Sequence, residues 1–107
     1  YDPFFFPDEA ALRQQYDFVS ATEVVEHFYH PEFSWNLLFS LLRPGGYLGI
    51  MTKCLTGETD FPTWYYRREE THVAFYRAET FRWIAERWGT RLSILDETGD
   101  VIAFQLV

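Results

Sequence analysis

The feature that most constrains the fold is a pair of short apolar segments joined by a helical segment. The first covers residues 16–22 (YDFVSAT), and the second covers residues 47–52 (YLGIMT). Between them, apolar residues recur at helical spacing after Pro31, and a Pro-Gly-Gly sequence ends that pattern. A strand, a crossover helix and a second strand favour two parallel strands in one sheet. The sequence therefore predicts an α/β domain.

The C-terminal part predicts a further helix and an antiparallel strand pair. Residues 78–88 have the apolar spacing of an amphipathic helix, and Gly89 follows where a helix end favours glycine. Residues 91–96 and 101–107 are predicted strands, and the Glu-Thr-Gly-Asp sequence between them is typical of a hairpin turn. We expect this hairpin to complete the sheet.

Composition narrows the classes of function. A chain of 107 residues with 48% hydrophobic residues can form one packed domain. A net charge of -7, with Lys53 as the single lysine, disfavours nucleic acid and an anionic membrane as partners. A single cysteine, Cys54, allows no internal disulfide, which fits the cytoplasm. We expect a cytoplasmic domain that acts on a small molecule.

The order of the predicted elements resembles the C-terminal half of the class I S-adenosylmethionine-dependent methyltransferases. The likeness rests on the segments YDFVSATEVVEHF and LLRPGGYLGIMT and on the closing hairpin. The resemblance implies a Rossmann-like sheet in which the four predicted strands correspond to strands 4, 5, 6 and 7 of the family, the last one antiparallel. It also implies transfer of a methyl group from S-adenosylmethionine, with an oxygen atom as the favoured acceptor.

Three residues correspond to cofactor-binding positions of that family. Asp2 matches the acidic residue that ends strand 2, and a carboxylate can accept hydrogen bonds from both ribose hydroxyls. Thr22 and Glu23 match the carboxyl end of strand 4, where open α/β sheets bind their ligands. The alternatives are an Asp-Pro turn for Asp2 and an ordinary polar strand end for Thr22.

The glycine-rich loop that holds the cofactor in this family has no counterpart in the sequence. The pair Gly45-Gly46 follows a helix and precedes a strand, which is the wrong context for such a loop. We therefore expect residues 1–107 to be a partial methyltransferase domain without strand 1, truncated and inactive alone. The edge of strand 4 would then be covered by the missing N-terminal half or by another chain. The alternative is a non-catalytic half-fold that serves as an assembly or binding module.

A possible metal site follows the first strand. Glu23, Glu26 and His27 would share one face of a helix, and His72 in the long connection 54–76 could add a fourth ligand. Such a set can bind Mg²⁺ or Mn²⁺, which would lower the pKa of an acceptor hydroxyl. The Glu-x-x-Glu-His pattern resembles the O-methyltransferases of ubiquinone biosynthesis and the small-RNA 2′-O-methyltransferases. The alternative is a pair that braces the helical turn without metal.

Overall fold

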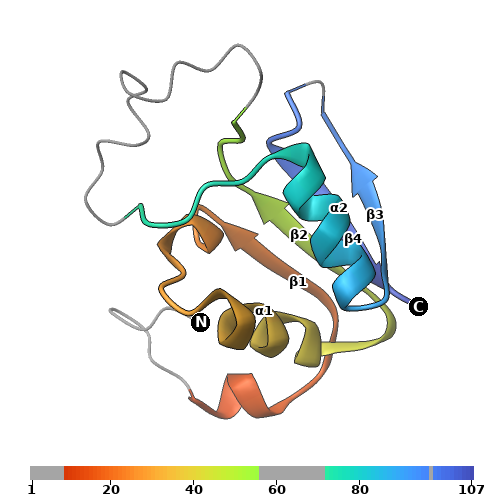
Figure 1. Ribbon diagram of the computed structural model, residues 1–107. Coiled ribbons are helices and arrows are strands. Elements are labelled where there is room, and N and C mark those ends of the chain that lie inside the picture. The colour runs from red at the N-terminus through yellow and green to blue at the C-terminus, as the bar shows by residue number, and fades with distance from the viewer. Residues whose placement is uncertain (1–8, 56–71, 97) are drawn as a thin grey trace.

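The computed structural model describes residues 9–55, 72–96 and 98–107 (Figure 1). Its elements, in chain order, are η1 (Glu9–Arg13), β1 (Tyr16–Thr22), η2 (Val25–His27), α1 (Pro31–Ser40), β2 (Leu42–Met51), α2 (Ala78–Arg87), β3 (Thr90–Ile94) and β4 (Val101–Leu106). The two η elements are 3₁₀ helices. No helix of the described residues is long and apolar enough to cross a membrane.

The four strands form one mixed sheet in the order β1-β2-β4-β3. β1 and β2 are parallel, and β4 runs antiparallel to both of its neighbours. The α/β class and the antiparallel final strand are thus confirmed. If β1, β2, β3 and β4 correspond to strands 4, 5, 6 and 7 of the family, this order is consistent with a partial Rossmann-like methyltransferase sheet.

The sequence prediction was wrong about where β2 begins. The strand starts at Leu42 rather than at residue 47, because Leu42 already pairs with Tyr16 of β1. The Pro-Gly-Gly sequence is therefore an irregularity inside the strand and not a turn before it. At Gly46 a Cβ atom would lie 2.9 Å from the carbonyl oxygen of Arg43 and 3.0 Å from that of Tyr16. Only glycine allows the two backbones to approach so closely.

Both α-helices cover the same face of the sheet, where the core lies (Figure 1). Alternate side chains of the strands point to this face, as the period of two in a strand requires. The core has an aromatic centre: the ring of Phe104, which is fully buried, lies 5.8 Å from that of Trp35 and 5.3 Å from that of Phe39. The carboxyl ends of β1 and β2 carry the residues of interest.

Candidate functional site

The chain turns sharply at the carboxyl end of β1. Glu23 has a φ of 55°, which non-glycine residues adopt rarely and at a cost. Its backbone N–H donates to the carbonyl of Met51 at 2.8 Å, so the end of β2 holds the turn. η2 then starts at Val25, which is completely buried. Glu23 therefore precedes the helical turn instead of sharing a helical face with the residues that follow it.

A segment from much later in the chain lies against η2. The backbone N–H groups of Val73 and Ala74 both donate to the carbonyl of Glu26, at 2.9 and 3.0 Å. The hydroxyl of Tyr76 donates to the carbonyl of Val25 at 2.8 Å. These three hydrogen bonds bring His72 beside η2.

Three of the four predicted metal ligands meet at this contact. One ligand atom from each of Glu26, His27 and His72 lies within 4.8 Å of the other two. The two imidazole rings are 4.9 Å apart, edge to face. Glu26 is completely buried, while both histidines are half-buried. One carboxylate and two imidazoles form a donor set that can hold a divalent cation. Glu23 is outside this cluster.

Tyr76 is a residue of this region that the sequence analysis did not identify. Its ring stacks on that of Phe81 with centroids 5.2 Å apart and meets the edge of Trp35 at 6.0 Å. Burial raises the pKa of the Tyr76 phenol to about 12, so the hydroxyl remains a hydrogen-bond donor at neutral pH. No local pattern indicates this role, because the carbonyl that accepts its hydrogen bond belongs to η2.

The carboxyl end of β2 is fastened to the hairpin turn between β3 and β4. The carboxylate of Asp100 accepts a hydrogen bond from the backbone N–H of Cys54 at 2.9 Å. The backbone carbonyl of Asp100 accepts one from the backbone N–H of Thr52 at 3.1 Å. Its carboxylate also lies 3.3 Å from the ammonium of Lys53.

Burial, reinforced by the charges of Asp100 and Asp96, raises the pKa of the Cys54 thiol to about 12. This thiol is therefore not a nucleophile at neutral pH.

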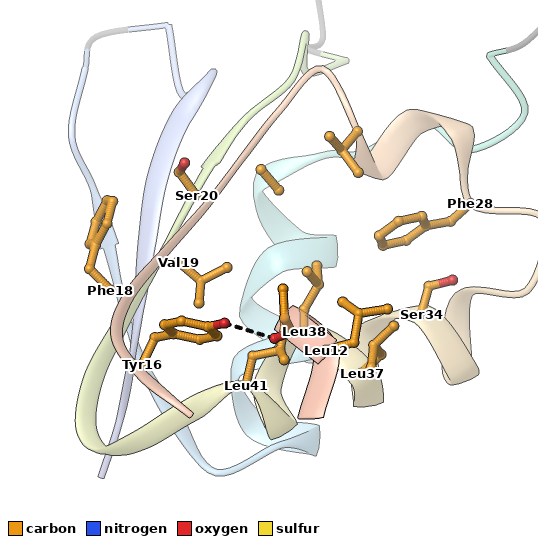
Figure 2. A pocket seen from close by; sticks show the side chains of 13 residues that line it. Leu12, Tyr16, Phe18, Val19, Ser20, Phe28, Ser34, Leu37, Leu38 and Leu41 are labelled. Carbon is orange, nitrogen blue, oxygen red and sulfur yellow. Dashed lines mark hydrogen bonds between the residues drawn. The ribbon is translucent and has the colours of Figure 1, made fainter. Parts of the chain in front are cut away.

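An apolar pocket of about 540 Å³ lies beside β1, between this strand, η1 and α1 (Figure 2). Val19, Leu38 and Leu41 contribute to its walls, and the hydroxyl of Tyr16 donates to the carbonyl of Ala11 at its rim. Among the described residues, β1 pairs with β2 alone. The pocket is thus next to the strand edge for which the sequence predicts a covering segment, and neither His27 nor His72 lines it.

The predicted cofactor residues remain predictions. Thr22 and Glu23 are exposed at the carboxyl end of β1, the kind of edge at which open α/β sheets bind ligands. Asp2 lies outside the described residues, as do most of the aromatic side chains of the long connection.

A comparison with known protein families identifies the family of this chain. A family model described as a methyltransferase domain matches residues 1–92, which include η2, both α-helices and His72. No curated protein matches the sequence. The chain therefore belongs to the methyltransferase domain family, which supports assignment to the class I enzymes that use S-adenosylmethionine as methyl donor.

Proposed function

We propose that this protein contributes the acceptor side of an enzyme that transfers a methyl group from S-adenosylmethionine to an oxygen atom of a small molecule. A divalent cation held by Glu26, His27 and His72 assists the reaction. The observation that carries the proposal is the convergence of these three ligand atoms within 4.8 Å, from two segments far apart in the sequence. The cluster follows the end of β1, which is also the end at which a cofactor is expected.

The donor set fits a divalent cation. The buried carboxylate of Glu26 supplies negative charge, and the two half-buried imidazoles supply nitrogen ligands. Of the two ions expected, this mixture favours Mn²⁺ over Mg²⁺, because imidazole nitrogen suits transition metals better than it suits Mg²⁺. A divalent cation bound by these residues would supply Lewis-acid chemistry that lowers the pKa of an acceptor hydroxyl.

The residues of the chain then have distinct tasks. The cluster orients the acceptor, while Thr22 and Glu23 border the cofactor and Asp2 accepts hydrogen bonds from its ribose. With S-adenosylmethionine bound, the acceptor hydroxyl would lose its proton to solvent, and its oxygen would attack the methyl carbon in line with the carbon–sulfur bond; that bond would break, and S-adenosylhomocysteine would leave. Most of the rate enhancement comes from this positioning.

Two features guide the choice of acceptor. The Glu-x-x-Glu-His sequence supports a hydroxylated acceptor of the kind used by the O-methyltransferases of ubiquinone biosynthesis, whereas the histidine added from the later loop resembles the small-RNA 2′-O-methyltransferases. A net charge of -7 disfavours RNA, since RNA binding rests largely on positive charge. A small molecule with neighbouring hydroxyl groups is therefore the acceptor class we propose.

The test is a methyl-transfer assay with labelled S-adenosylmethionine against hydroxylated aromatic compounds and RNA, run with Mn²⁺ and with a chelator. We expect activity on a small hydroxylated compound that the chelator removes and that His72→Ala loses. His30→Ala is the matched control, because it removes an exposed imidazole outside the cluster. Equal rates with and without chelator would remove the metal from the proposal.

Cofactor binding is tested separately by calorimetry with S-adenosylhomocysteine. Asp2→Ala should weaken binding, and Asp17→Ala, which removes an exposed carboxylate 3.5 Å from Arg43, should not. Affinity that is the same in both variants would contradict the ribose role of Asp2.

A second candidate function rests on the edge of β1. A strand edge beside an apolar pocket favours pairing with a further segment. We propose that this edge is covered either by another part of a longer protein or by another chain, and in the latter case the domain could serve as an assembly module. Sedimentation tests this, because a well-folded, strictly monomeric chain of residues 1–107 would contradict both forms of the idea.

A further inference from the structure

The alignment of His72 with η2 depends on a small set of hydrogen bonds. The carbonyl of Glu26 accepts from the backbone N–H groups of Val73 and Ala74, and the carbonyl of Val25 accepts from the hydroxyl of Tyr76. The first two bonds belong to the peptide backbone and cannot be removed by changing a side chain. The third depends on one hydroxyl group, that of Tyr76.

Tyr76 is held in place through its hydroxyl, its ring and its backbone carbonyl. Its ring is parallel to that of Phe81, with an angle of 6° between the planes, and it is 4% exposed. Its carbonyl accepts from the N–H of Leu55 at 2.7 Å, in a short bridge between Cys54 and Tyr76. Tyr76 therefore joins η2, the segment that follows β2 and the core, all close to His72.

We propose that Tyr76 is the positioning residue of the Glu26–His27–His72 cluster: its hydroxyl holds η2 against the 72–76 segment so that both imidazoles meet at one cation. Ligands that come from separate segments bind a cation tightly only when the fold holds them in place beforehand. This inference rests on the proposed metal site and adds the residue that sets its geometry.

The test uses Mn²⁺ alone as the probe, with free Mn²⁺ measured by electron paramagnetic resonance during titration of the protein. Tyr76→Phe removes the hydroxyl and keeps the ring, and we expect a loss of Mn²⁺ affinity of about tenfold, at the lower end of the effects seen for groups that orient metal ligands. Tyr16→Phe is the matched control. It removes a phenol-to-carbonyl hydrogen bond of the same 2.8 Å length, donated to Ala11, at the opposite end of β1.

The comparison separates positioning from general stability, because both variants lose one hydrogen bond of the same kind. Unchanged affinity in folded Tyr76→Phe, or an equal loss in both variants, overturns the inference and leaves the metal site standing. Absence of Mn²⁺ binding by the unmodified protein overturns both. If Tyr76→Phe does not fold in buffer alone, the titration is repeated in trimethylamine N-oxide, an osmolyte that favours the folded state without restoring the hydroxyl. A weaker affinity then supports the inference, and an unchanged one refutes it.

Discussion

Manganese should raise the unfolding temperature of this protein, provided that Glu26 and His72 are intact. The cluster exists only in the folded state, because three hydrogen bonds from the 73–76 segment bring His72 to η2. A ligand that binds only the folded state stabilises it in proportion to the logarithm of its concentration. The change in unfolding temperature therefore reports on the assembled site.

The size of the change follows from two numbers. At a Mn²⁺ concentration of 100 times the dissociation constant, the free energy of unfolding increases by about 2.7 kcal/mol. A chain of 107 residues has an unfolding entropy of roughly 0.2 kcal/mol per degree, at about 2 cal/mol per degree and residue. Their ratio predicts an increase of about 13 °C, approached logarithmically with concentration.

Thermal unfolding followed by circular dichroism across a Mn²⁺ titration measures this change. Glu26→Gln and His72→Ala should each remove most of it, and His30→Ala should retain it, because His30 is exposed and outside the cluster. Mg²⁺ should produce a smaller change than Mn²⁺, because two of the three ligands are imidazoles. An equal increase in His72→Ala and in the unmodified protein would refute the reasoning, because it would assign the ion to other groups.

Three further results are expected. The pKa of the Cys54 thiol is raised from 9.0 to about 12. The contribution of the protonated thiol to the free energy of unfolding is therefore complete below pH 9 and is lost as the pH rises towards 12. Iodoacetamide at pH 9 should accordingly alkylate Cys54 far more slowly than free cysteine, as mass spectrometry would show; a comparable rate would contradict the burial argument. Phe104→Ala should lower the free energy of unfolding by about 3–5 kcal/mol in denaturant titrations, because the ring is fully buried among aromatic partners, and a loss under about 1 kcal/mol would contradict this core. Gly46→Ala should cost about 1–3 kcal/mol in the same titrations, since its Cβ would meet two carbonyl oxygens, and no loss would contradict the close approach.

The sequence predicted the elements whose signals are local. Residues 16–22 form β1 as expected, because a short apolar segment between turn signals needs no distant information to be recognised. The amphipathic spacing of α2 and the turn before β4 are local patterns of the same kind. The strand order required more, and it came from the resemblance to a known family.

The start of β2 could not be predicted in this way. The predicted strand omitted its first five residues, 42–46, which include a proline and two glycines. They belong to the strand because Leu42 pairs with Tyr16, a contact between distant positions. The low strand propensity of proline and glycine is therefore outweighed here by pairing across the sheet.

In the candidate site, too, some features could be predicted from the sequence and others depend on the tertiary structure. The sequence by itself determined which residues can bind a cation, since Glu26, His27 and His72 are named by their chemistry. Only the tertiary structure decided which of them meet: a positive φ at Glu23 leaves that residue outside the cluster, and Tyr76 helps to hold His72 beside it. The physical reason is that side-chain chemistry belongs to single residues, whereas a distance between ligands results from hydrogen bonds and packing between segments far apart in the chain.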